Sequence, residues 1–93
     1  MRDRQFIEGL RVLAAMGLSF DAWLYHPQLP ELVDAARAVP DLTIVLDHLG
    51  GPVGIGRHED RAAALVNWRA SMAEVAQCPN VFLKVGGIGM PTF

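Results

Sequence analysis

The feature of this sequence that most constrains its fold is a regular alternation of helical and strand-like stretches. Each of three stretches with apolar residues at helical spacing is followed by a short run that is typical of a strand. The expected helices cover residues 4–16, 30–39 and 59–77, and the expected strands cover residues 18–25, 42–48 and 81–86. Such alternation predicts an α/β fold with parallel, adjacent strands in sequence order and the helices on one side.

Local signals support the expected helices. Asp3 stands where it can cap the first helix, and Gly17 follows that helix where a left-handed residue is favoured. Pro30 suits the first residue of the second helix. The apolar stripes that we expect to face the core are Phe6, Leu10, Leu13 and Ala14, then Leu32, Ala36 and Val39, then Leu65, Trp68, Met72 and Val75.

The run 42–48 is the clearest strand, and its near-continuous apolar character is typical of a parallel strand buried on both faces. Two architectures fit the pattern: a small open sheet of three strands, or three consecutive units of a (β/α)8 barrel, which normally needs about 250 residues. The 93-residue chain is 52% hydrophobic, which is high for so small a body. An open sheet would also expose two apolar edges. Both arguments favour the barrel segment, with residues 1–93 as one partial domain.

Composition excludes several classes of protein. The net charge of −2 gives no basic field for nucleic acid. No apolar run reaches the roughly 18 residues of a membrane span, and the first ten residues do not resemble a signal peptide. The one cysteine, Cys78, excludes an internal disulfide and indicates a reducing, cytoplasmic location. It has no basic neighbour in sequence, so we expect a packed structural thiol and not a reactive one.

Functional side chains are expected at the carboxyl ends of the strands, where parallel α/β folds gather them. Those ends carry Tyr25 and His26, then Asp47 and His48, then the glycine-rich segment 86–89. We therefore expect His26, His48 and Gly87 at one edge of the sheet. A histidine at a strand end can equally be a hydrogen-bonded loop residue, and His58, in a polar loop, is expected to be solvated.

Strand alternation assigns these residues to faces. If His48 points into a barrel, Ile44 and Leu46 share its face and Asp47 points toward the helices. In the third strand Lys84 shares a face with Phe82 and Gly86. A lysine inside an apolar strand needs an anionic partner or a functional task. Asp21 and Trp23 are the candidates to meet it. We expect Asp21 and Lys84 to approach each other on the face away from the helices, with a water or substrate group as a bridge because their strands are not adjacent.

Other motifs give weaker signals. The sequence contains no HxH, HExxH or CxxC, so spacing does not indicate a metal site. Within the glycine-rich stretch 49–58, residues 51–58 approach a phosphate-binding loop in spacing but lack its Lys and Ser/Thr, and they lack the third glycine of a dinucleotide-binding motif. We therefore interpret the stretch as a flexible active-site loop.

Four segments resemble the amidohydrolase-related (amidohydrolase 2) family. They are FDAWLYHPQLPEL (20–32), IVLDHLGGPVG (44–54), NWR (67–69) and CPNVFLKVGGIGM (78–90), in that order. The resemblance runs through nearly the whole chain. Its most specific part is Asp-His-Leu-Gly-Gly-Pro after a buried strand, followed by Pro-Asn-Val-x-x-Lys-x-Gly-Gly.

The resemblance implies a TIM-barrel hydrolase, with the three strands here as the fourth, fifth and sixth. It places His48 at the active site, as a ligand of a divalent metal such as zinc or as the group that stabilises the oxyanion. Some members of the family work without a metal. The family's HxH pair on the first strand and Asp on the eighth have no counterpart here.

The expected function is hydrolysis of a lactone, ester or amide of a small carboxylate-bearing substrate, with His48 catalytic. His26, Tyr25, Lys84 and Gly87 are the candidate substrate-binding residues. The chain by itself holds too few ligands for the reaction, and we expect it to self-associate through exposed sheet edges. The alternative is a non-enzymatic α/β module that packs against a partner.

Overall fold

The computed structural model describes residues 1–51 and 61–86 of the chain. The elements are α1 (Arg4–Ala15), β1 (Phe20–Ala22), the 3-10 turn η1 (His26–Gln28), α2 (Leu29–Ala38), β2 (Ile44–Leu46), the 3-10 turn η2 (His48–Gly50), α3 (Arg61–Val75) and β3 (Val81–Leu83). The alternation predicted from sequence is therefore confirmed. Each strand is shorter than expected, because the ladder covers only the middle of the first two apolar runs and the start of the third.

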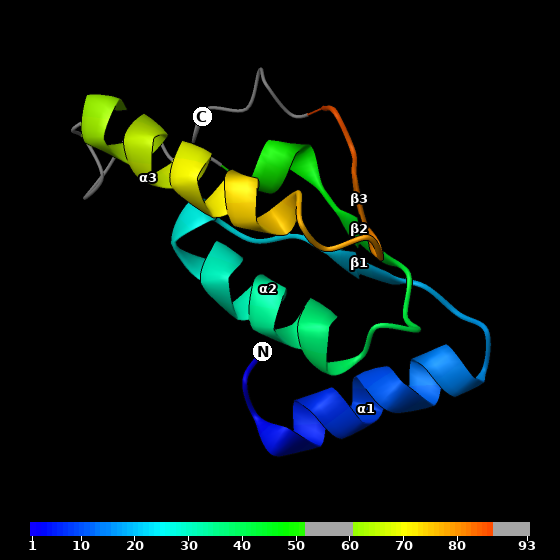
Figure 1. Ribbon diagram of the computed structural model, residues 1–93. Coiled ribbons are helices and arrows are strands. Elements are labelled where there is room, and N and C mark those ends of the chain that lie inside the picture. Colours follow the sequence, from blue (N-terminus) through cyan, green and yellow to red (C-terminus); the bar gives the residue numbers. More distant parts are fainter. Residues whose placement is uncertain (52–60, 87–93) are drawn as a thin grey trace.

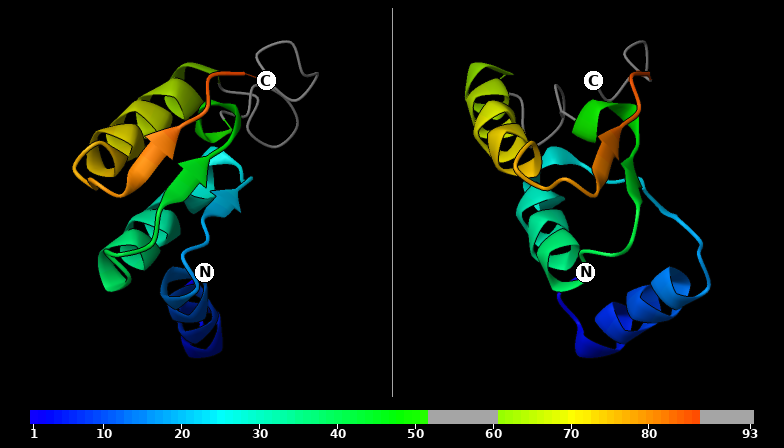
Figure 2. Two further views of the ribbon diagram at one scale, coloured as in Figure 1. Left: turned by 90° about the vertical axis from the view of Figure 1, so that its right-hand side faces the viewer. Right: turned by 45° about the vertical axis from the view of Figure 1, so that its right-hand side comes forward.

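The three strands form one parallel sheet in the order β1-β2-β3. Phe20 is in register with Ile44, which is in register with Val81. Figure 2 shows the strands side by side and pointing the same way. The predicted parallel, sequential order is confirmed. Within the part of the chain that the structure describes, β1 and β3 each have one neighbouring strand, so both are edge strands.

Helices α2 and α3 cover one face of the sheet, as predicted for them, and no helix or strand within residues 1–51 and 61–86 covers the other face, which we call the open face (Figure 1). Helix α1 lies at the end of the molecule where the strands begin, beside α2 (Figure 2). The core between sheet and helices contains Leu10, Ala22, Leu24, Leu29, Leu32, Val33, Ala35, Ala36, Val39, Leu42, Ile44, Leu46, Val75 and Cys78. No helix among the described residues is long and apolar enough to cross a membrane.

The face that β2 buries differs from the prediction. Ile44 and Leu46 are fully buried in the core shared with α2, so they face the helices and not a barrel interior. Val45 lies on the open face, in register with Asp21 and Phe82. The predicted phase of β2 was wrong because an apolar run on both faces carries no alternation from which to read it.

The helix signals are mostly confirmed. The Asp3 carboxylate accepts a hydrogen bond of 2.7 Å from the Gln5 N–H and caps α1. Pro30 lies in the first turn of α2, one residue later than predicted. In α3, Leu65 is exposed and Ala64 is buried in its place, so that one prediction for the stripe was wrong. A helix turns by about 100° per residue, so a shift of one position exchanges the two.

Asn80 joins the helical layer to the sheet at the amino ends of the strands. Its side-chain N–H group donates to the carbonyls of Ala36, Val39 and Leu42, at 3.2, 3.2 and 2.9 Å. Ala36 lies in the last turn of α2, and Val39 and Leu42 follow that helix. The two N–H bonds of one amide group are thus shared among three carbonyls at the junction between α2 and β2.

Candidate active site

The rings of Trp23, Tyr25 and His48 gather just beyond the carboxyl ends of β1 and β2, on the open side of the sheet. Strand alternation after Val45 assigns the Asp47 side chain to the same side. The Trp23 ring lies 5.6 Å from the Tyr25 ring and 6.3 Å from the His48 ring, measured between centroids. The Asp47 N–H donates to the Ala22 carbonyl at 2.9 Å, so the ladder continues one residue past the strands. Hydrogen bonds of the sheet therefore hold the backbone that carries these side chains.

The backbone of His48 explains why Asp47 and His48 both lie at this site. His48 has a φ of +52°. Among the residues that the structure describes, no other residue except glycine has a positive φ. Asp47 continues the open face after Val45, so plain alternation would turn His48 toward the helices. The left-handed conformation breaks that alternation, and the imidazole meets Trp23 edge-on at 90°. This conformation costs about 1–2 kcal/mol for an L-residue, so the surrounding structure must hold it.

Gly51 supplies part of that hold. It has a φ of +60°, and a Cβ at this position would overlap the Leu24 carbonyl oxygen and lie 2.9 Å from the Tyr25 Cα. Its own carbonyl accepts a 2.9 Å hydrogen bond from the His26 N–H. The turn after β2 is thus pressed against the chain that leaves β1. Only glycine permits this approach, which fixes His48 beside Trp23.

Two buried polar atoms at the site have no hydrogen-bond partner within residues 1–51 and 61–86: Asp47 Oδ1 and His48 Nδ1. Buried polar atoms in native proteins are nearly always bonded, so a partner from outside these residues is expected. An imidazole nitrogen and a carboxylate oxygen are both metal ligands, and both can also bind water or substrate. The described residues contain no group of three His, Cys, Asp or Glu that could hold a metal ion.

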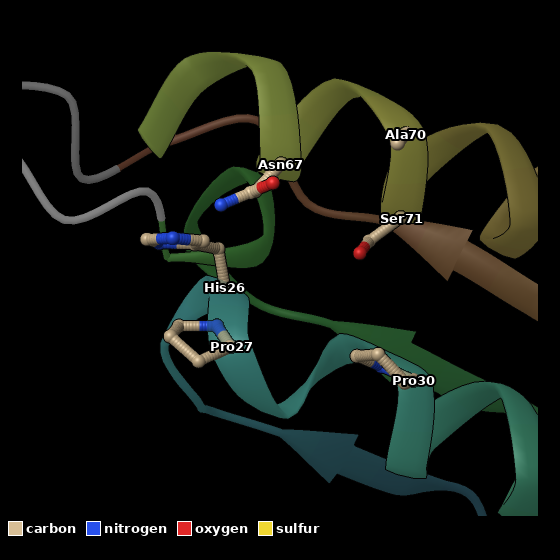
Figure 3. A pocket seen from close by; sticks show the side chains of 6 residues that line it. All are labelled: His26, Pro27, Pro30, Asn67, Ala70 and Ser71. Atoms are coloured by element: carbon tan, nitrogen blue, oxygen red, sulfur yellow. The ribbon is translucent and has the colours of Figure 1, made fainter. Parts of the chain in front are cut away.

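The structure places His26 apart from this group. Its side chain is 4% exposed and lines a cavity of about 380 Å³ between η1, α2 and α3. Figure 3 shows the Asn67 side chain pointing toward the His26 ring, with Ser71 one turn further along α3. His26 follows β1 as predicted, but its ring lies on the helical side of the sheet. Its backbone N–H, through the bond to Gly51, is what reaches the site.

Asp21 and Lys84 form no direct ion pair in the structure, so their expected approach is not observed as a contact between the two side chains. Both side chains are exposed, and none of the ion pairs among the described residues includes either of them. They belong to β1 and to the end of β3, with β2 between them, so two interstrand spacings of about 4.8 Å separate their backbones. Asp21 is also in register with Phe82, two residues before Lys84. Water solvates both charges, which removes the need for a partner.

Lys84 nevertheless follows β3 at the same level as the group. Its N–H donates to the Leu46 carbonyl at 2.8 Å, which parallels the bond from Asp47 to Ala22. Gly87, the other candidate on this strand, lies outside the described residues, as do His58 and most of the glycine-rich stretch 49–58. Cys78 is buried and its thiol lies 3.7 Å from the Glu74 carbonyl, which confirms the expected packed thiol.

Trp23 is a site residue that the sequence pattern does not single out. The pattern predicts it on the interior face as a neighbour of Lys84, and the structure does place it on the open face. The available signal was its position: it shares a face with Asp21 and stands at the carboxyl end of the strand.

Parallel βα units with polar groups at the carboxyl ends of the strands are the arrangement of (β/α)8-barrel enzymes. The sequence model of the Amidohydrolase family matches residues 2–91, and the chain belongs to this family. The three parallel strands correspond to a segment of the TIM barrels of these proteins.

The chain is similar to several particular proteins of known sequence or structure. The uncharacterized protein y4mH of Sinorhizobium fredii is 38% identical over 89 residues, which are 96% of this chain and 28% of that protein. L-fucono-1,5-lactonase of Burkholderia ambifaria is 38% identical over 77 residues, 82% of this chain and 24% of the lactonase. A crystal structure of an amidohydrolase from Burkholderia multivorans with bound zinc matches with a TM-score of 0.78 and 30% identity, over 91% of this chain and 28% of that one. The chain thus spans less than a third of the length of these proteins.

Proposed function

We propose that this segment belongs to an enzyme that hydrolyses a lactone, ester or amide of a small carboxylate-bearing substrate. The observation that carries the proposal is the placement of His48. It stands at the carboxyl end of β2 in a left-handed conformation, and its buried Nδ1 has no partner in the described part of the chain. The relatives named L-fucono-1,5-lactonase support a cyclic ester as the substrate.

The segment acts as one part of a complete barrel, with its strands as the fourth to sixth of eight. The open sheet face and the two edge strands support this assignment, because a barrel covers the one and pairs the others. The remaining catalytic groups then come from strands other than these three. The buried free thiol of Cys78 supports a reducing, cytoplasmic location.

A divalent metal such as zinc fits the two unpartnered atoms. Imidazole nitrogen and carboxylate oxygen are zinc ligands, so His48 Nδ1 and Asp47 Oδ1 would supply part of a ligand set. When bound, zinc polarises a carbonyl or lowers the pKa of a bound water. The bound zinc in the Burkholderia multivorans relative supports this cofactor. In an enzyme without a metal, His48 stabilises the developing oxyanion directly.

The reaction needs few groups. The oxygen of water bonds to the carbonyl carbon, the ring C–O bond breaks, and the leaving oxygen takes a proton, which gives the hydroxy acid. His48 faces the reacting carbonyl. Tyr25 and Gly87 shape the pocket, and the Lys84 ammonium suits a substrate carboxylate. His26 contributes through its backbone, which fixes Gly51 and with it the turn that carries His48.

A non-enzymatic module is the second candidate. It is favoured by one observation: the described residues contain no group of three metal-ligating side chains. Such a module would bury the open sheet face against a partner and would bind no small molecule.

The test is kcat/KM of the intact protein, by which we mean the complete barrel proposed above, on a panel of lactones with and without added zinc. His48→Ala should lower kcat/KM by about 10²–10³-fold. His48→Gly should lower it equally but should be more stable than His48→Ala by about 1 kcal/mol, because glycine tolerates a φ of +52°. The matched control is His58→Ala, which should leave kcat/KM nearly unchanged. Equal, small effects at both histidines would remove His48 from the mechanism, and an intact protein that hydrolyses nothing on the panel would favour the module.

A further inference from the structure

Trp23 is a large aromatic side chain on the open face of the sheet, at the carboxyl end of β1. It is 52% exposed, whereas the other tryptophan, Trp68, is partly buried against the core. Trp23 stands one residue past β1, level with Asp47 and Lys84, whose N–H groups extend the ladder by one residue. In a closed barrel this level is the top layer of the interior, directly below the mouth.

Trp23 and His48 form a corner. Their rings are perpendicular, with centroids 6.3 Å apart, and Tyr25 leans against Trp23 at 57° with its centroid 5.6 Å away. Tyr25 therefore limits how the indole can rotate. A flat molecule that lies on the indole at this corner meets the imidazole with its edge.

Cyclic sugar-derived esters match this shape. A six-membered lactone ring has faces made of C–H groups, while its carbonyl and hydroxyls project from the edge. An indole ring is a large, rigid, apolar surface that buries such a face with little loss of side-chain entropy. An open-chain ester of the same acid has no rigid face to lay on the ring.

We propose that Trp23 is a specificity-determining residue that stacks on the ring of a cyclic sugar-derived ester and directs its carbonyl edge toward His48. This inference rests on the proposed function and names the contact by which the site prefers lactones to open-chain esters. It predicts that removal of the indole changes substrate binding more than the chemical step.

The experiment compares L-fucono-1,5-lactone with methyl L-fuconate in the intact protein. Trp23→Leu should raise KM for the lactone by about 3- to 10-fold, with a smaller change in kcat, and should alter kcat/KM for the methyl ester less than 2-fold. Trp23→Phe keeps a flat ring and should recover part of the loss. The matched control, Trp68→Phe, should lower the melting temperature without changing the ratio of the two kcat/KM values.

Equal losses on the two esters, or a loss in kcat alone, would overturn the proposal. If the intact protein hydrolyses neither ester, the proposed function fails, and the stacking site is judged by binding. The probe is then L-fucono-1,5-lactam, added to the Trp68→Phe protein while the Trp23 indole N–H resonance is followed by NMR. A saturable shift that His48→Gly leaves in place supports the stacking site, and the absence of a shift overturns it.

Discussion

The contact between Gly51 and the chain leaving β1 can be tested by one methyl group. Gly51→Ala places a Cβ on the Leu24 carbonyl oxygen and 2.9 Å from the Tyr25 Cα. Both obstacles are backbone atoms, so no side chain can rotate away. The two segments must separate, which weakens the hydrogen bond from the His26 N–H to the Gly51 carbonyl.

The expected loss has two parts. A φ of +60° costs alanine about 1 kcal/mol more than glycine. A weakened hydrogen bond adds about 0.5–1.5 kcal/mol, and strain in the displaced backbone adds to both. Gly51→Ala should therefore lower the free energy of unfolding by at least about 2 kcal/mol.

Two glycines of α1 and its end provide matched controls. Gly17 has a φ of +72° with no atom within 4 Å of an added Cβ, so Gly17→Ala should show the backbone cost without the overlap, about 1 kcal/mol. Gly9 lies inside the helix with equal space around it, so Gly9→Ala should raise the free energy of unfolding by about 0.5–1 kcal/mol.

Urea unfolding of the intact protein, followed by far-ultraviolet circular dichroism, gives the three values. Gly51→Ala should lower the free energy of unfolding by about 1 kcal/mol or more beyond the loss in Gly17→Ala. If the two variants lose the same free energy of unfolding, the close approach to Leu24 does not contribute to stability, and glycine is needed at position 51 for its φ alone.

Two further predictions concern the joint at Asn80 and the open face. Asn80→Ala removes the two N–H donors that three backbone carbonyls share, and it should lower the free energy of unfolding by about 1–3 kcal/mol. Arg37→Ala breaks an exposed ion pair with Glu74 and should change the free energy of unfolding by less than about 0.5 kcal/mol. Similar small losses for the two variants in urea unfolding would contradict this. The 93-residue chain expressed by itself should self-associate, because Trp23 and Phe82 lie exposed on the open face. Light scattering measures the association, and Phe82→Lys should reduce it. A monomer that melts cooperatively would refute the expectation.

The parallel order of the strands could be predicted from sequence because it rests on alternation and on the handedness of crossovers, which need no knowledge of contacts. The capping of α1 by Asp3 and the left-handed Gly17 could be predicted for the same reason, since both are local. The face of β2 could not. Ile44, Val45 and Leu46 are all apolar, and which of them meets the helices depends on the register with β1 and on the stripe of α2.

Some features of the candidate site could be predicted from sequence and others could not. The sequence indicates that His48 ends a buried strand, but alternation sets Asp47 and His48 on opposite faces and so places one of them wrongly. The backbone at His48 reverses this, and the reversal depends on Gly51, which directly follows the turn His48–Gly50 and contacts the chain that leaves β1. The glycine pair after His48 is visible in the sequence, yet its meaning is a contact 27 residues back along the chain, at Leu24. Strand alternation cannot predict a left-handed residue that is held by a contact so remote in sequence. Backbone strain of this kind persists only where the surrounding structure enforces it. The left-handed conformation of His48 is therefore also the reason to look for chemistry at this residue.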